Sequence, residues 1–419
     1  MERAYRTCLA RGFKKENIYV LHYTYILDLD GDYINDVRDI ATLPKLTEAI
    51  EDWAAHRNYP STNLYIFLTG HGNVDSYTMV GSSNLTPVKL DSMLNKYCSI
   101  NEAYKINIVY DACKSGSFID ELSKSGRVVM TSTNDSLLSW FKEDGSFSFG
   151  LLIWNKFALG YSFKETFNWI ASLVKEVYGD DKQIPLFDDN GDGVGHREPL
   201  PNGGDGHFGE WIRWGPGISS RSPMEPPEIE EFTLEELGDS VFFQITTSMP
   251  VDSCWVLIVR QDTTYEFAEG ELPMIDIPSV MLSSTTPLEY EGTIYKGDYR
   301  GECKFVGLTM APPTGIHIVG DYSYAVSADT ILTLGMIEDV IIPDKHTFSV
   351  KPNPFNSAVS ITAPENATVE IFDIMGKSIA ILEGGEQIWR PEASIGSGVY
   401  LVSATVGEQS ITKRVVYLK

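Results

Sequence analysis

Two side chains that could together cleave an acyl bond each follow an apolar stretch of the chain. His71 lies between Gly70 and Gly72 after the run 63–69, and Cys113 follows the run 106–110. A thiol with an ordinary pKa of about 8.5 becomes a useful nucleophile when an imidazole favours its thiolate. We therefore predict that Cys113 is a nucleophile and that His71 protonates the leaving amine and later activates water.

Small residues surround both candidates and let a substrate backbone approach closely. The amide N–H groups of Gly72 and Cys113 are candidates for binding a developing oxyanion, and losing one such donor typically lowers turnover by about 10²–10³. A single cysteine is more often inert core, and a single Gly-His-Gly is a weak turn signal. The prediction rests on their joint occurrence, each at the end of an apolar strand.

Elements of alternating type must position these two residues. The continuous apolar runs 63–69, 106–110 and 127–132 are typical of strands covered on both faces, and a further strand is expected at 17–23. Segments with helical spacing separate these runs, and one of them opens with the capping box of Ser162 and Glu165. This alternation predicts an α/β three-layer sandwich with a mostly parallel sheet, whose carboxyl strand ends form the binding crevice.

The character of the sequence changes near residue 217, where a Ser/Pro-rich stretch at 219–227 predicts an extended linker. Short alternating runs such as 241–245, 254–259 and 316–319 then predict an all-β immunoglobulin-like sandwich over residues 218–345. A second all-β sandwich domain is predicted for residues 346–419. The first domain is accordingly expected to span residues 1–217.

Composition limits the classes of partner. The chain has 419 residues, 43% of them hydrophobic, and a formal net charge of −25, so nucleic acid is not expected as a partner. Residues 218–345 carry 22 acidic and 6 basic side chains, whereas residues 1–217 carry 29 and 21. We interpret this acidity as keeping an exposed β domain in solution. No apolar run approaches the roughly 18–20 residues that span a bilayer, so no transmembrane segment is expected.

Five cysteines are too few and too scattered for a disulfide framework. Cys254 and Cys303 lie in the same predicted domain and could pair in an exported protein, but their spacing leaves this open.

Two acidic loops space oxygen donors two residues apart around glycine, as calcium loops do. The oxygen donors are Asp28, Asp30, Asp32 and Asp36 in the first loop, and Asp188, Asn190 and Asp192 in the second. Neither loop is a complete EF-hand, because the glutamate at the twelfth position is absent. Structural calcium and Asx-rich turns that need no ion both remain open.

The residues around His71 and Cys113 resemble the legumain-like branch of the caspase and gingipain clan of cysteine peptidases. The matching segments are 66–72, a hydrophobic strand followed by Gly-His-Gly, and 109–118, a strand followed by Asp-Ala-Cys-Lys-Ser-Gly. The resemblance implies a caspase-like fold and peptide-bond hydrolysis through a thioester on Cys113, with no cofactor in catalysis. In that family a further strand precedes the first helix, so we expect this strand and an export signal to be missing from the sequence.

The resemblance also implies a pocket for the residue before the scissile bond, formed partly by the loop 133–140. Asp135 would select a basic residue there, and Ser136 or Ser139 an asparagine, although a solvated loop acid is the alternative for Asp135.

The last 74 residues resemble the type A sorting domain of the bacterial type IX secretion system. The matching motifs are 349–356, 369–377 and 396–402, followed by a basic strand. The resemblance implies passage through the type IX machinery and release or anchoring at the cell surface. The sequence thus predicts a secreted or cell-surface cysteine endopeptidase that acts on proteins or peptides. A peptide ligase or transamidase of the same clan and a catalytically silent surface-binding protein are the alternatives.

Overall fold

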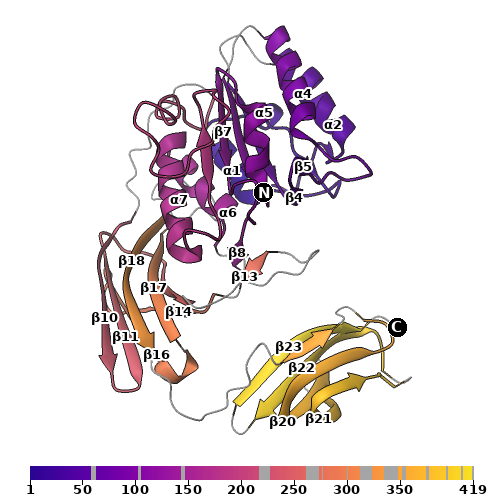
Figure 1. Cartoon of the computed structure of the whole chain (residues 1–419), viewed down its shortest axis with the longest axis vertical. Coiled ribbons are helices and arrows are strands. Elements are labelled where there is room, and N and C mark those ends of the chain that lie inside the picture. The colour runs from indigo at the N-terminus through magenta and orange to yellow at the C-terminus, as the bar shows by residue number, and fades with distance from the viewer. Residues whose placement is uncertain are drawn as a thin grey trace. The chain divides into compact units, whose positions relative to one another are not determined.

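The computed structural model describes residues 1–57, 63–101, 105–142, 147–216, 227–260, 273–275, 277–299, 301–311, 323–334, 348–351, 355–373, 377–392, 395–406 and 409–417. The chain divides into two compact units, Met1–Gly335 and Met336–Lys419 (Figure 1). The strand predicted at 316–319 and most of the linker predicted at 219–227 lie outside the described residues. Among the described residues, no helix has both the length and the apolar character that crossing a bilayer requires.

A four-stranded sheet forms the centre of the amino-terminal part. Its strands follow the order β3 (Leu64–Thr69), β6 (Ile106–Asp111), β7 (Arg127–Thr131) and β9 (Leu186–Asp188). The first three are parallel, and β9 runs antiparallel to β7. The first five residues of β6 are buried, because hydrophobic cores cover both faces of the sheet. This is the mostly parallel sheet that the apolar runs predict.

Helices pack on both faces of this sheet. On one face, Phe149 and Val174 join the core that contains Val109; on the other, Leu90 and Leu94 join the core that contains Ile108. The helices of the first face are α1 (Glu2–Ala10), α6 (Phe149–Ala158) and α7 (Phe163–Tyr178). Those of the second are α2 (Leu43–Glu48), η2 (Ala49–Ala54), α3 (Ala55–Arg57), α4 (Pro87–Ile100) and α5 (Ile119–Leu122). Both hydrogen bonds of the predicted capping box are present at the start of α7.

The strand predicted at 17–23 is much shorter in the structure. Only β1 (Leu21–His22) pairs, in parallel with β2 (Asp39–Ile40), after a 3-10 turn η1 (Lys15–Asn17). The apolar residues of this segment are buried outside the central sheet, because Val20 packs with Tyr5 and Leu29 in a small separate core. The remaining short elements of this part are β4 (Gly72–Asn73), β5 (Ser76–Tyr77), η3 (Ser115–Phe118) and β8 (Phe141–Lys142).

Two four-stranded sheets complete the first unit, in the orders β10-β11-β16-β15 and β14-β12-β17-β18. Val241 and Phe243 of one sheet pack against Val256 and Phe305 of the other. The strands are β10 (Ile229–Leu237), β11 (Ser240–Thr247), β12 (Ser253–Arg260), β14 (Ser279–Met281), β15 (Ser283–Ser284), β16 (Glu289–Tyr295), β17 (Gly301–Ala311) and β18 (Ser323–Leu334), with the 3-10 turn η4 (Lys296–Asp298) between β16 and β17. The short strand β13 (Met274–Ile275) belongs to neither sheet and pairs in parallel with β8.

The two cysteines of this sandwich do not pair. Cys254 lies opposite Thr309 and Cys303 lies opposite Arg260 on the neighbouring strands β12 and β17. Both thiols are buried, and neither is part of a disulfide. The pairing that the sequence left open is therefore absent.

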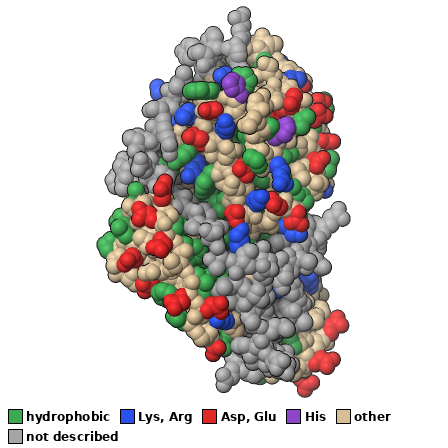
Figure 2. All heavy atoms as spheres, turned by 60° about the vertical axis from the view of Figure 1, so that its left-hand side comes forward, with side chains coloured by type: hydrophobic (Ala, Val, Ile, Leu, Met, Phe, Trp, Pro, Cys, Tyr) green, Lys and Arg blue, Asp and Glu red, His purple; other side chains and the backbone are tan. Residues whose placement is uncertain are grey.

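Part of the acidity of residues 218–345 lies on the edge strand β10. Glu230, Glu231, Glu235 and Glu236 of β10 are all exposed, and β10 ends its sheet. Charged side chains on an exposed edge oppose pairing with other chains. Acidic side chains are scattered over the face shown in Figure 2 and do not gather in one patch. These features fit an acidity that keeps the sandwich in solution.

Strand β12 is covered on both of its faces. Residues 254–259 are buried at every position, where the sequence pattern predicted alternation. Val256 faces the sandwich core, whereas Trp255 and Leu257 join the core formed by α6 and α7. Residues of the predicted segments 1–217 and 218–345 thus share one hydrophobic core, and the first compact unit includes both segments as far as Gly335. Their boundary stays a prediction.

The second unit is all-β, as predicted. Its strands surround a core that includes Phe348, Val369 and Val402. They are β19 (Ser349–Lys351), β20 (Val359–Asp373), β21 (Ser378–Trp389), β22 (Gly398–Val406) and β23 (Gln409–Tyr417). The runs 359–362 and 369–373 form one long strand, whose pairing with β21 shifts register between Ala363 and Thr368.

Candidate active site

The parallel pairing of β3 with β6 brings the two predicted catalytic residues to one edge of the sheet. Thr69 and Asp111 are partners at the ends of these strands, and His71 and Cys113 each follow two residues later. The amide of Gly70 donates a hydrogen bond to the Asp111 carbonyl oxygen at 3.2 Å. The loops therefore leave the sheet in register.

His71 opens the β4–β5 hairpin, and its carbonyl oxygen accepts a hydrogen bond from the Thr78 amide at 2.9 Å. Next to it, Gly72 lies against the nucleophile loop so closely that an added Cβ would be 2.4 Å from the Cys113 carbonyl oxygen. The His71 imidazole is exposed and has no hydrogen-bond partner among the described residues. The backbones of the two loops therefore lie close together, and the imidazole is exposed to solvent.

Replacing Gly72 by alanine is expected to lower kcat/KM by about 10²–10³, because the methyl group must push the Cys113 carbonyl away and disturb both loops. The melting temperature should fall by only a few degrees, since the hairpin lies at the surface. Gly396→Ala is the control, because its added methyl group meets nothing within 4 Å. Unchanged turnover in Gly72→Ala would contradict the assigned site.

The environment of Cys113 both opposes and supports thiolate formation. Burial raises the pKa of the Cys113 thiol, while backbone N–H groups of Ser139 and of Cys113 itself partly offset this. The following residue, Lys114, has a left-handed backbone with φ 56° and donates its amide to the Leu137 carbonyl oxygen. Its ammonium binds Asn73 Oδ1 at 2.9 Å. The nucleophile loop is thus tied to both neighbouring loops.

Asp111 is a site residue that the sequence analysis did not single out. Its carboxylate lies two residues before Cys113 and accepts a hydrogen bond from the Ser139 hydroxyl at 2.9 Å. It also accepts hydrogen bonds from Ser132 and from the Gly150 amide near the start of α6, and burial raises its pKa. A carboxylate at the end of an otherwise apolar strand was the available signal.

The three predicted pocket residues have different surroundings. Ser139 is 8% exposed, and its hydroxyl is already used by Asp111. Ser136 is exposed, and its hydroxyl and amide both donate to Asn134 Oδ1. Asp135 is exposed and lines a hollow of about 420 Å³ beside the turn that follows Cys113. The structure therefore does not bring the three side chains to one point, and their roles with substrate stay predictions.

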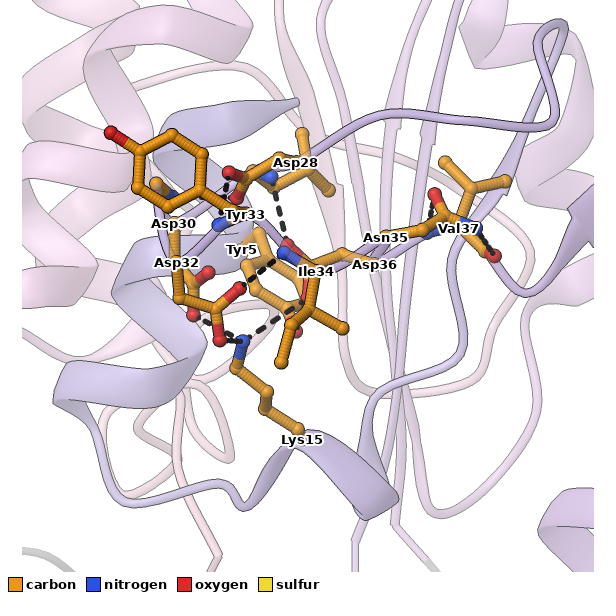
Figure 3. A network of polar contacts seen from close by, with 12 residues as sticks. Tyr5, Lys15, Asp28, Asp30, Asp32, Tyr33, Ile34, Asn35, Asp36 and Val37 are labelled. Carbon is orange, nitrogen blue, oxygen red and sulfur yellow. Dashed lines mark hydrogen bonds and ion pairs between the residues drawn. The ribbon is translucent and has the colours of Figure 1, made fainter.

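The first acidic loop wraps around a lysine that the sequence analysis did not include (Figure 3). Oxygen atoms of Asp28, Asp30 and Asp36 lie within 4.8 Å of one another. The Lys15 ammonium binds Asp30 and Asp32 at 2.7 Å each and Asp36 at 3.4 Å. Hydrogen bonds to Asp30 and Asp32 raise the pKa of Lys15. A fixed ammonium thus supplies positive charge where a cation was predicted, and calcium binding stays a prediction.

Replacing Lys15 by methionine is expected to lower the free energy of unfolding by about 1–2 kcal/mol, because Asp36, which is 3% exposed, loses its counter-charge. Thermal unfolding in a chelator measures this loss without competition from divalent ions. Lys14→Met is the matched control, because Lys14 is exposed and has no ion pair among the described residues. Equal melting temperatures for the two variants would show that the ammonium contributes nothing.

The second acidic loop lies beside a group of buried carboxylates. Asp188, Asp189 and Asp205 are 0%, 1% and 3% exposed. The Ser123 hydroxyl donates one hydrogen bond that is shared between the two carboxylate oxygens of Asp188, and burial raises the pKa of Asp188 to about 6. Asp205 binds His196 Nδ1 at 2.7 Å.

The two other predicted ligands of this loop form a turn. Asn190 Oδ1 accepts a hydrogen bond from the Asp192 amide at 2.8 Å, and Asn190 Nδ2 donates to Asp192 Oδ2. This is the pattern of an Asx-rich turn, which was the alternative to an ion site. Calcium in this loop also stays a prediction.

Three of the solved structures that match the chain resemble only parts of it, at TM-scores too low to support an argument. The BSP domain of a biofilm associated protein is 9% identical with a TM-score of 0.16, and this chain covers 29% of its length. The FN1–FN3 domains of chicken CNTN1 are 9% identical over 48% of this chain and 71% of theirs, with a TM-score of 0.18. The amphioxus IgVJ-C2 molecule is 12% identical over 43% of this chain and 97% of its own, with a TM-score of 0.14.

Family comparisons are more specific. No curated protein matches the chain. Residues 51–147, which contain both His71 and Cys113, match the model of the Peptidase C13 family. Residues 349–418 match the secretion system C-terminal sorting domain. Both resemblances drawn from the sequence are confirmed, and the chain carries a Peptidase C13 segment in its first unit and a secretion sorting domain at its carboxyl end.

Proposed function

We propose that the protein is a secreted or cell-surface cysteine endopeptidase that hydrolyses peptide bonds through Cys113 and His71. The observation that carries the proposal is the contact of Gly72 with the Cys113 carbonyl, which joins the imidazole loop to the thiol loop. The family match over residues 51–147 supports the chemistry, and the sorting domain supports export through a type IX secretion machinery to the cell surface or beyond.

In the proposed reaction, the Cys113 thiolate attacks the scissile carbonyl carbon and forms a tetrahedral oxyanion, stabilised by amide N–H groups of Gly72 and Cys113. His71 then protonates the leaving amine, and a thioester remains on Cys113. His71 next removes a proton from water, which hydrolyses the thioester. Asp111 acts as a positioning residue, because it holds the Ser139 segment whose amide contacts the thiol.

Detection of the thioester tests this proposal. The full chain is incubated with a peptide library, quenched in acid, and the masses of products and protein are measured. The expected results are cleaved peptides and an acyl adduct that maps to the tryptic peptide containing Cys113. An adduct on the exposed Cys98, or no cleavage of any peptide, would sink the proposal. The latter result would favour the silent surface-binding alternative.

The ligase alternative is separated by adding an amine acceptor to the same reaction. Both reactions share the thioester, and they differ in whether water or an amine resolves it. If the protein is a hydrolase, products that carry the added amine stay a minor fraction at millimolar acceptor. If such products dominate, transamidation is the activity.

A further inference from the structure

The hollow beside the nucleophile loop has a volume of about 420 Å³, is open to solvent and is lined by four segments. They are the β4–β5 hairpin with Asp75, the turn 116–117, helix α5 with Asp120, and the segment 186–195. Asp135 completes the rim. We propose that this hollow binds a lysine or arginine side chain of the substrate on the amine side of the scissile bond, an inference that rests on the proposed peptidase function.

Three carboxylates give the hollow a negative charge. Asp75, Asp120 and Asp135 are exposed, and none of them has a hydrogen bond or ion pair from its side chain among the described residues. Each carboxylate is therefore free to bind an incoming cation. Lys114, two residues before Gly116, is held by Asn73, and Arg197, two residues after Gly195, pairs with Asp180. Three unpaired negative charges around one concavity attract a positive group and repel a negative one.

The lining of the hollow also has apolar side chains and leaves space for a long side chain. The lining contributes the apolar side chains of Val74, Ile119 and Leu186, on which the methylene stem of lysine or arginine can pack. Its floor includes Gly193 and Gly195, which have no side chain to fill the space. A Cβ on Gly195 would be 2.5 Å from Ile119 Cδ1 and 3.1 Å from Leu186 Cβ, so a side chain there would have to displace the apolar lining. A flexible, cationic side chain fits this lining better than a flat aromatic ring.

The position of His71 decides which side of the scissile bond reaches the hollow. The group that protonates the leaving amine must lie beside the scissile nitrogen, so the substrate residues after this nitrogen run past the His71 hairpin. Val74 and Asp75 of that hairpin line the hollow. The Asp75 amide donates to the Ser117 hydroxyl at 2.9 Å, which ties the hairpin to the turn after Cys113. The hollow is thus continuous with the leaving-group side of the site.

The test compares peptides with lysine, norleucine or glutamate at each of the first three positions after the scissile bond. The wild type is expected to cleave the best lysine peptide with a kcat/KM at least about tenfold above that of its norleucine partner. This ratio should fall to about twofold or less in the triple variant Asp75→Asn, Asp120→Asn, Asp135→Asn. It should also fall in 1 M salt, which screens exposed charges.

Glu121→Gln is the matched control, because Glu121 is exposed on the same helix as Asp120 and does not line the hollow. Its lysine-to-norleucine ratio should equal that of the wild type. If the triple variant unfolds, the three single variants carry the same comparison. A wild type without preference for lysine, or a triple variant that keeps the preference, overturns the inference.

A binding measurement separates failure of this inference from failure of the proposed function. The Cys113→Ala protein is titrated with labelled tripeptide amides that contain lysine or norleucine, and fluorescence anisotropy is recorded. Tighter binding of the lysine peptide, lost in the triple variant, supports the hollow even if no peptide is cleaved. Equal binding of both peptides by a protein that does cleave peptides contradicts the hollow alone.

Discussion

Replacing Cys113 by alanine is expected to lower peptide turnover by at least about 10⁴, to the level of the uncatalysed background. The methyl group cannot attack a carbonyl, and no other thiol lies in this loop. His71→Ala should have an effect of similar size, because thiolate formation and protonation of the leaving amine both depend on the imidazole. The double variant should be no worse than either single one, since the two groups act as a unit.

Controls separate chemistry from folding in this experiment. Cys98→Ala removes an exposed thiol at the end of α4 and should leave turnover unchanged. The melting temperature of Cys113→Ala should stay within a few degrees of the wild type, since the thiol is only half-buried. Cleavage by Cys113→Ala at the wild-type rate would exclude the thioester mechanism. If turnover is lost only in Cys98→Ala, Cys98 and not Cys113 is the nucleophile.

Replacing Leu257 by alanine is expected to lower the free energy of unfolding of the first unit by about 3 kcal/mol. Leu257 is 0% exposed and belongs to the core formed by α6 and α7, although it lies on a strand of the β-sandwich. The cavity therefore opens between the α/β layer and the sandwich. We expect one cooperative transition, in which α7 and β12 become exposed together.

Denaturant titration followed by hydrogen exchange measures this coupling. Exchange should accelerate to the same extent in peptides from α7 and β12 of Leu257→Ala. Thr233→Ala on the exposed face of β10 is the control and should change stability by less than about 0.5 kcal/mol. Two separate transitions, with α7 protected as in the wild type, would show that the sandwich unfolds independently of the α/β part.

The placement of His71 and Cys113 after neighbouring strand ends was predictable because it depends on local rules. Both residues end continuous apolar runs, and parallel strands joined by a helix place such ends side by side. The second hydrophobic face of β12 was signalled in the same way by the apolar residues 254–259, but the surrounding turn residues suggested an alternating strand. Which partner covers such a face depends on contacts far apart in sequence.

Long-range polar contacts were the least predictable part of the site. The charge of Lys15 neutralises Asp30 and Asp36 from a separate turn, whereas the spacing within the acidic loop left calcium and an ion-free turn both open. Ser139 was expected to face substrate, whereas its hydroxyl binds Asp111 across the loop. A sequence pattern shows which residues carry oxygen atoms, but it does not show which hydrogen bonds or ion pairs those atoms already make.

The buried carboxyl group of Asp188 makes the folded protein a proton acceptor in weak acid. Its pKa of about 6 lies above the value of about 4 expected when unfolded, so between these pH values the native state binds more protons. This group therefore adds stability as the pH falls from about 6 to 4. At Asp91, burial raises the pKa, but Lys124 and Arg127 outweigh it and lower the pKa, so its stabilising effect fades only at more acidic pH. Mild acidification should therefore protonate Asp188 in the native state without unfolding the protein.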